Sequence, residues 1–118
     1  MAAAMTADER GHLEVRVRAV TRIAEITAGR VDGVEPVTGG LTSKALPRVE
    51  ATIRDGKVRA TVEAATRWPT PIADVAARVR TSVADDLRQS SGLEVDTVDV
   101  VMRYVAPEKN TSSGRRVE

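Results

Sequence analysis

The dipeptide Asp55-Gly56, set between two runs of alternating apolar and polar residues, restricts the fold of this chain more than any other feature. Both residue types tolerate the positive φ angles of a two-residue hairpin turn, so the runs are predicted to pair as antiparallel strands. Such a turn sets the cross-strand pairs as Arg54–Lys57, Ile53–Val58, Thr52–Arg59, Ala51–Ala60, Glu50–Thr61, Val49–Val62 and Arg48–Glu63. The apolar pairs then share one face of the hairpin, and a slip of one residue would destroy this separation.

Residues 68–105 predict one helix followed by one strand. Thr70 is expected to cap the helix, with Pro71 at its first position, where a missing N–H costs nothing. Gly92, which tolerates a left-handed conformation, ends the helix. The helix has an apolar stripe formed by Ile72, Val75, Ala76, Val79, Val83 and Leu87, and Asp74 is spaced for an ion pair with Arg78 on its polar side. In the strand that follows, Val98, Val100, Met102 and Tyr104 alternate with Thr97, Asp99, Val101 and Arg103.

The N-terminal part of the chain gives weaker signals. Residues 1–10 lack periodicity and are expected to form a flexible tail. Alternation over residues 13–17 indicates a short strand, and residues 34–37 indicate an edge strand that Pro36 interrupts. Between these segments a helical stripe is formed by Val20, Ile23, Ala24, Thr27, Ala28 and Val31.

Together these elements predict an α+β fold within the broad α/β class. We expect a two-layer sandwich, in which a small mixed β-sheet carries two helices on one face. The single domain should cover residues 11–106, and residues 107–118 should form a disordered tail. If the last strand is parallel to the second hairpin strand, the connection through the helix should be right-handed. The other face of the sheet should contact water unless a partner covers it.

Composition excludes several classes of protein. The net charge of +1 provides neither a basic field for nucleic acid nor an acidic tail. The absence of cysteine excludes disulfides and thiolate chemistry. No apolar run approaches the ~20 residues that span a bilayer, and the first residues lack the basic and hydrophobic regions of a signal peptide. The expected location is therefore cytoplasmic.

No constellation of side chains predicts catalysis. The carboxylate pairs Asp85-Asp86, Asp8-Glu9 and Glu94 with Asp96 fit solvated faces, because adjacent helical residues point about 100° apart and do not converge. His12 has no second histidine or cysteine to share a metal ion. The serines lack nucleophile-elbow spacing, and Gly39-Gly40 lacks the residues of a phosphate loop. We expect no enzymatic activity, no cofactor and no catalytic, cofactor-binding or metal-binding residue, and the sequence leaves the partner-binding residues unknown.

Nucleic-acid binding is the alternative from another class. A KH domain needs a GxxG loop and an RNA-recognition motif needs stacking aromatics on its sheet, whereas Tyr104 is the one aromatic residue expected inside a strand. The first helical region is rich in arginine, at Arg16, Arg18, Arg22 and Arg30. Glu14, Glu25 and Asp32 balance these charges, which favours a solubilising face over a nucleic-acid site.

Two groups of residues occur in an order and separation typical of one known family. The first comprises Gly11, Leu13, Val15, Ile23-Ala24, Val31 and Gly33-Val34, with the loop Gly39-Gly40-Leu41 after it. The second comprises Pro71, Ile72, Asp74, Val75, Ala76, Gly92, Leu93, Val95, Val98 and Val100. On these residues the chain resembles the alkaline-shock protein family, bacterial envelope stress response proteins, over residues 11–105. The chain departs from the family pattern at residues 16–18 and at Trp68-Pro69, where any partner surface would differ.

The resemblance implies a non-enzymatic cytoplasmic protein, held at the membrane in some members by an anchored partner. We therefore expect a protein-interaction or scaffold role in envelope stress response or envelope homeostasis. The partners should be other proteins, and the resemblance leaves open whether the chain also associates with itself. Binding would use an exposed sheet edge or the polar sheet face. The chain is not expected to insert into the membrane directly. Regulation of a metabolic enzyme complex is a further alternative that the resemblance leaves open.

Overall fold

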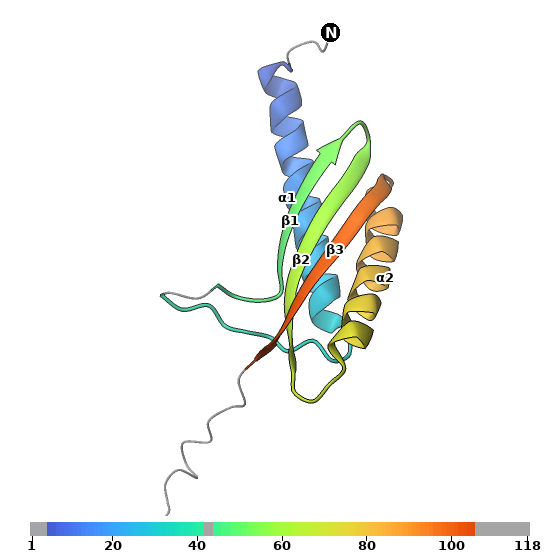
Figure 1. Ribbon diagram of the computed structural model, residues 1–118. Coiled ribbons are helices and arrows are strands. Elements are labelled where there is room, and N and C mark those ends of the chain that lie inside the picture. The colour runs from blue at the N-terminus through green and yellow to red at the C-terminus, as the bar shows by residue number, and fades with distance from the viewer. Residues whose placement is uncertain (1–4, 42–43, 106–118) are drawn as a thin grey trace, which may run out of the picture.

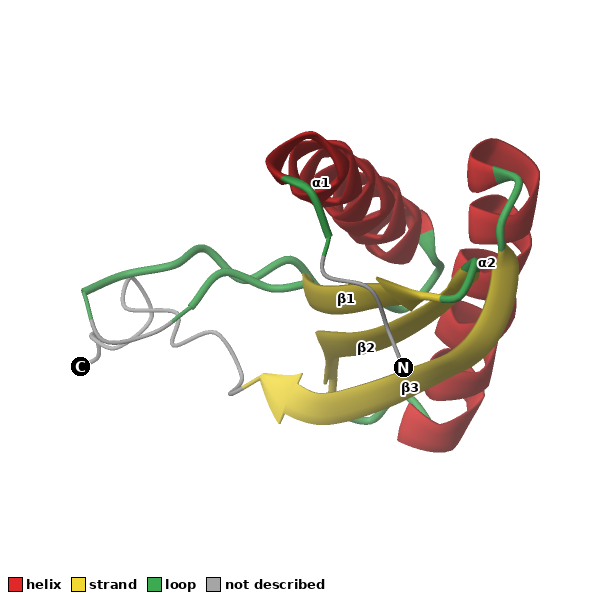
Figure 2. Cartoon of the chain, turned by 90° about the horizontal axis from the view of Figure 1, so that it is seen from above, coloured by secondary structure: helices red, strands yellow, loops and turns green. Residues whose placement is uncertain are grey.

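The computed structural model describes residues 5–41 and 44–105, which form two layers (Figures 1 and 2). Along the chain the elements are α1 (Ala7–Arg30), β1 (Arg48–Arg54), β2 (Lys57–Arg67), α2 (Ile72–Ser91) and β3 (Glu94–Val105). The sheet has the order β1-β2-β3, with β1 antiparallel and β3 parallel to β2. Both helices cover the same face of this sheet, as Figure 2 shows. The α+β sandwich with a mixed sheet is confirmed.

The hairpin has the register that the sequence predicts. All of the expected pairs, from Arg48–Glu63 at the open end to Arg54–Lys57 at the turn, are present. The turn residues Asp55 and Gly56 have φ angles of 54° and 73°. Both central positions of the turn are left-handed, which matches the twist of the two strands.

Short aliphatic side chains build the core between the two layers. The expected stripe on α2 is buried at Val75, Val79, Val83 and Leu87, and the stripe on α1 is buried at Val20, Ala24, Thr27 and Ala28. They pack on the alternate residues of the hairpin and β3, chiefly Val49, Val58, Ala60, Val62, Ala64 and Val98. The central strand β2 therefore contributes the largest share of the sheet side of the core.

The first helix is longer than expected, and the strand expected over residues 13–17 is absent. α1 begins at Ala7, so residues 7–10 are helical and do not form the expected tail, whereas residues 1–4 lie outside the described residues. Thr6 caps the helix by accepting a hydrogen bond from the Glu9 N–H, at 3.1 Å, while the Glu9 carboxylate accepts one from the Thr6 N–H, at 3.0 Å. This capping box satisfies two N–H groups that a helix start otherwise leaves unpaired.

The connection from α1 to β1 forms one isolated bridge in place of the edge strand expected over residues 34–37. Val37 exchanges two backbone hydrogen bonds with Leu46, and Pro36 has no N–H with which to extend a ladder. The start of the segment is fixed to β2, because the Glu35 N–H donates to the Ala65 carbonyl at 2.8 Å and the Thr66 hydroxyl donates to the Gly33 carbonyl at 2.6 Å. The loop predicted around Gly39-Gly40 lies in this connection, and residues 42–43 lie outside the described part.

The start of α2 also differs by one residue from the sequence prediction. Pro71 is the N-cap residue, the helix begins at Ile72, and Thr70 makes no capping hydrogen bond. Instead, the Thr70 N–H donates to the Arg67 carbonyl at 2.9 Å, and the Thr70 carbonyl accepts from the Tyr104 hydroxyl at 3.0 Å. Both backbone groups of Thr70 therefore form hydrogen bonds at the turn that precedes α2. At the other end of α2, Gly92 has the predicted left-handed conformation, with φ at 71°.

Two glycines with positive φ provide a matched test of this packing. Gly33 has a φ of 98°, and a Cβ there would lie 2.8 Å from Cγ2 of the buried Val75, whereas a Cβ on Gly56 would meet nothing within 4 Å. We expect Gly56→Ala to lower the free energy of unfolding by about 1 kcal/mol through backbone strain alone. Gly33→Ala should cost roughly 1–3 kcal/mol more because of the added clash. Urea denaturation measures both, and equal costs would contradict the close approach of Gly33 to α2.

A second prediction concerns Glu35, whose carboxylate lies 2.8 Å from a guanidinium nitrogen of Arg67. The hydrogen bond from Arg67 holds the pKa of Glu35 below its ordinary value. The folded carboxyl therefore has a lower pKa than the unfolded one, so its contribution to stability is present above the unfolded pKa and is lost as the pH falls through the folded pKa. We expect Glu35→Gln to flatten the loss of stability below about pH 5, measured by urea denaturation at several pH values. An unchanged slope would show that the pair is not formed in solution.

Candidate functional site

The side chains weighed as catalytic candidates are engaged with structural partners. Asp85 accepts a hydrogen bond from Arg88 at 3.0 Å, and Asp8 lies 4.0 Å from His12 on the exposed start of α1. Asp86 does not lie on a solvated face, because it accepts a 2.7 Å hydrogen bond from the Thr27 hydroxyl and joins the two helices. Within residues 5–41 and 44–105, no three His, Cys, Asp or Glu side chains gather as a metal ion would require. Asp85 and Asp86 thus contact other residues of the fold, and the one contact between two candidates is the exposed pair of Asp8 and His12 among the described residues.

The two candidate carboxylate residues of β3 also make contacts within the fold. Asp96 lies at a bulge between β2 and β3, and its Oδ2 is 2.9 Å from Nε of Arg59. This hydrogen bond, together with the attraction between the two charges, raises the pKa of Arg59 above its ordinary value. Glu94 is exposed near the hairpin turn, where its N–H donates to the Gly56 carbonyl at 3.2 Å. Glu94 and Asp96 therefore do not form a pair that could exchange a proton.

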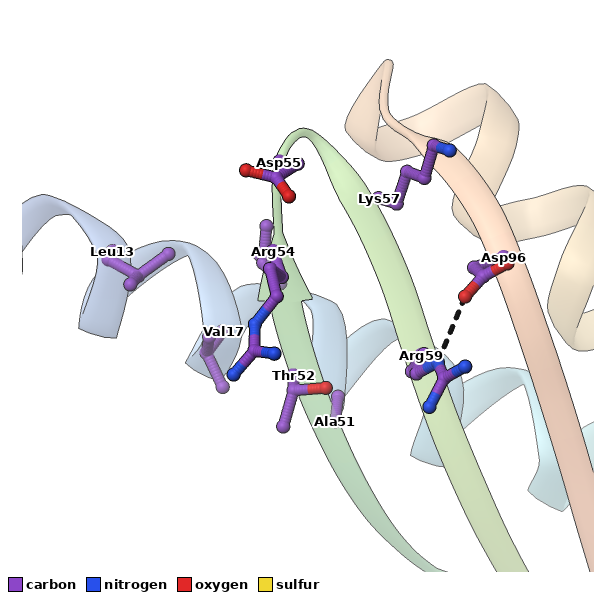
Figure 3. A pocket seen from close by; sticks show the side chains of 10 residues that line it. Leu13, Val17, Ala51, Thr52, Arg54, Asp55, Lys57, Arg59 and Asp96 are labelled. Atoms are coloured by element: carbon purple, nitrogen blue, oxygen red, sulfur yellow. Dashed lines mark hydrogen bonds and ion pairs between the residues drawn. The ribbon is translucent and has the colours of Figure 1, made fainter. Parts of the chain in front are cut away.

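A groove lies between the first half of α1 and the tip of the hairpin (Figure 3). Its volume is about 670 Å³. It is lined by Leu13 and Val17 on α1, by Ala51, Thr52, Ile53 and Arg54 on β1, and by Asp55, Lys57, Arg59 and Asp96. Figure 3 shows the α1 side chains on one side of β1 and the Arg59–Asp96 pair on the other. We call this feature the α1–β1 groove.

The groove exists because α1 is longer than β1, the edge strand beside it. The helix has 24 residues, or about 36 Å, whereas the 7 residues of β1 extend about 24 Å. Its buried residues begin at Val20, and of the residues before it only Leu13 and Val17 are partly buried. Val15 is 61% exposed. The first half of the helix thus extends past the core beside the hairpin tip, as Figure 1 shows.

The edge of β1 along this groove has unpaired backbone groups. In a two-residue hairpin the residues next to the turn form a hydrogen-bonded pair, so Arg54 and Thr52 direct their N–H and C=O groups toward β2. Ala51 and Ile53 alternate with them and therefore direct these groups outward. Neither residue makes a further hydrogen bond with any group in the described chain. The sequence predicts binding at an exposed sheet edge in general terms, but no local pattern in it locates that edge at β1.

The ionisable side chains that line the groove are three cations and two carboxylates, and Glu94 on β3 is the cross-strand neighbour of Lys57. Arg54 and Lys57 stand opposite each other at the hairpin tip and form no ion pair within the described residues. Arg59, in contrast, is neutralised by Asp96. On the helix side, Arg16 lines a smaller hollow next to Leu13 and is also unpaired in the described chain. Asp55 is the single carboxylate between the two hairpin cations.

The two aromatic side chains of the protein meet at the opposite end of the sheet. The rings of Trp68 and Tyr104 pack edge to face with centroids 5.4 Å apart. Trp68 remains 67% exposed. The pair supports the turn before α2, because the Tyr104 hydroxyl donates to the Thr70 carbonyl. An RNA-recognition motif stacks nucleic-acid bases on aromatic rings of its sheet face. The rings of Trp68 and Tyr104 do not lie on the open face of this sheet.

Comparison with known proteins identifies the family. A family model described as the alkaline shock protein 23 family, of cell envelope-related function, matches residues 5–107. The chain belongs to this family. The match covers the whole sandwich, including the start of α1 that lies beyond the core. Among curated proteins, none matches the chain.

Solved structures of MamM CTD variants share the fold of this alkaline-shock family member. A zinc form has a TM-score of 0.59 at 16% identity, covering 86% of this chain and 94% of that chain. A nickel form has a TM-score of 0.58 at 14% identity, with coverage of 75% and 99%. A manganese form has a TM-score of 0.56 at 14% identity, with coverage of 75% and 98%. At these identities the likeness concerns the fold alone.

No helix in the described ranges has the length and apolar character needed to cross a membrane.

Two valines test whether the first half of α1 lies outside the core. Val83 is fully buried in α2, whereas Val17 is partly buried beside the groove. We expect Val83→Ala to lower the free energy of unfolding by about 2 kcal/mol, since two buried methyl groups are lost and a cavity remains. Val17→Ala should cost less than about 1 kcal/mol, because solvent already reaches this side chain. Urea denaturation compares the two, and equal losses would mean that α1 packs tightly along its full length.

Proposed function

We propose that this protein is a non-catalytic interaction protein of the cell envelope that acts by binding other proteins. The observation that carries the proposal is the α1–β1 groove, where an unpaired sheet edge lies next to apolar side chains and to two cations that form no ion pair in the described chain. Exposed strand edges are common sites of protein association because they offer a row of unsatisfied backbone groups. Membership of a family with a cell envelope-related function supports the envelope as the setting.

The sheet edge is a better interaction surface than the polar face of the sheet. On that face Arg48 lies 3.3 Å from Glu50 and 3.5 Å from Glu63, while Arg59 is paired with Asp96. These contacts neutralise charges that a partner would otherwise bind. The backbone groups of Ala51 and Ile53 have no such internal partner in the described chain. Binding at the edge therefore has less to displace.

The proposed setting is cytoplasmic, at the inner side of the membrane, with attachment through a partner that is itself anchored. The helices of the described chain show no span of membrane-crossing character. The exposed positive residues of α1 are interspersed with Asp8, Glu9 and Glu14, so the helix is not the uniformly basic amphipathic type that binds lipid directly. Indirect attachment is consistent with both features.

Fractionation and affinity capture test this proposal. We expect the protein, tagged at its native locus, to fractionate in part with membranes and to capture envelope proteins. Salt-dependent binding to single-stranded RNA serves as the comparison, since several phosphate contacts would give a steep loss of affinity with added salt. A wholly soluble protein that captures no envelope protein would refute the proposal. Capture of a metabolic enzyme complex in their place would favour the regulatory alternative.

A further inference from the structure

We propose that the α1–β1 groove binds an extended segment of a partner protein, which adds to β1 as a further strand and carries acidic side chains at alternate positions. This inference rests on the proposed interaction function and specifies the chemistry of the partner. Three features of the groove support it independently, namely the backbone edge, the apolar wall and the unpaired cations.

The backbone edge selects an extended partner. Ala51 and Ile53 each present an N–H and a C=O to the groove with no hydrogen-bond partner in the described chain. The outward groups of these two residues are spaced by about 6.8 Å, which matches the repeat of an antiparallel or parallel strand. A helix has no free backbone groups along its length and could not satisfy them. An added strand satisfies them all.

The two sides of the groove select an alternating side-chain pattern. Leu13 and Val17 line the groove from α1 (Figure 3), and Ile53 packs against the core on the face of β1 that the helices cover. Arg54 and its partner Lys57 alternate with Ile53 and Val58 and therefore lie on the open face. Successive side chains of a strand point to opposite faces of a sheet. An added strand would therefore place every second side chain against the apolar wall and the others toward the two cations. Apolar residues alternating with Asp or Glu fit both environments.

A second copy of this chain fits the groove less well. Its own β1 would bring Arg48 and Arg54 with a single carboxylate, Glu50, which already lies 3.3 Å from Arg48. A second β1 edge, with two arginines, one carboxylate and Lys57 next to it, would add net positive charge and no acidic strand. An acidic strand from another protein meets the same cations with opposite charge. Self-pairing through β1 is therefore treated as an outcome that would overturn the proposal.

Three synthetic peptides test the proposal on the full chain. The first is a nine-residue peptide of alternating valine and glutamate, the second has lysine in place of glutamate, and the third is the glutamate peptide with N-methyl groups on alternate amides. We expect the lysine peptide to bind at least tenfold more weakly than the glutamate peptide, measured by fluorescence anisotropy at low salt. The peptide N-methylated on the edge-facing amides should lose binding to a similar degree, because it cannot pair with the edge. Equal affinity of all three peptides would refute the proposal.

Amide hydrogen exchange locates the bound peptide. With the glutamate peptide present, the amides of Ala51 and Ile53 should exchange at least tenfold more slowly. The amide of Thr52, which faces β2 in the free protein, provides an internal control and should change little. Binding without protection of Ala51 and Ile53 would place the peptide elsewhere and overturn the assignment. Dimerisation of the free protein that already protects these two amides would show that a second copy occupies the edge.

Charge reversal separates this inference from the proposed function. The double variant Arg54→Glu with Lys57→Glu should reverse the preference, so that the lysine peptide binds better than the glutamate peptide. Arg103→Glu, at the far end of β3, is the matched control and should leave the preference unchanged. If the double variant still captures the same envelope proteins as the unmodified chain, the groove assignment fails while the proposed function stands. If the peptides bind as expected but no envelope protein is captured, the function fails while the groove assignment stands.

Discussion

The burial of short aliphatic side chains between β2 and the two helices is the constraint on which the rest of the structure depends. β2 is paired on both edges, and its core face bears Val58, Ala60, Val62 and Ala64. Valine and alanine have little volume, so the two helices must match this face along a narrow stripe. Leu87 is the largest of the fully buried side chains. A core of this kind leaves almost no polar group inside it, apart from the hydrogen-bonded Thr27 and Thr66.

The same constraint explains why the α1–β1 groove and the aromatic pair lie at the ends of the sheet. α2 lies within the limits of the sheet, but α1 continues for about half of its length beyond the first buried residue, Val20. The overhanging half and the tip of the hairpin form the α1–β1 groove. At the other end the two aromatic residues, too large for this core, pack against each other on the surface. The exposed groove and the exposed aromatic pair therefore occur where the aliphatic layer ends.

The electrostatic arrangement follows a related division. On the open face of the sheet, arginine and carboxylate side chains alternate across strands and neutralise one another, as Arg48 does with Glu63. At the hairpin tip Arg54 stands opposite Lys57, and like charges across a strand pair are unfavourable unless something compensates them. Neither of these two cations forms an ion pair in the described chain, although Glu94 is the neighbour of Lys57 on β3, and both lie beside an unpaired strand edge.

The sequence alone determined the parts of the fold that depend on neighbouring residues. The Asp55-Gly56 turn specified the hairpin register, and the stripe from Val75 to Leu87 specified α2 and its buried face, because turn geometry and helical periodicity are local. The start of α1 is also marked locally, by the capping box of Thr6 and Glu9, but the alternation at residues 13–17 predicts a strand. That alternation is ambiguous, because Leu13 and Val17 are also spaced for one face of a helix.

The exposed surface of the protein depends on how the elements pack against one another. Contacts between residues distant in the chain determine which sheet edge stays unpaired. They also determine how far α1 extends past the hairpin and which cations lack a partner. The contact of Asp86 with Thr27 joins residues 59 positions apart, and no local pattern indicates it. Local propensity determines the individual elements, whereas a groove between elements exists only once their packing and relative lengths are fixed.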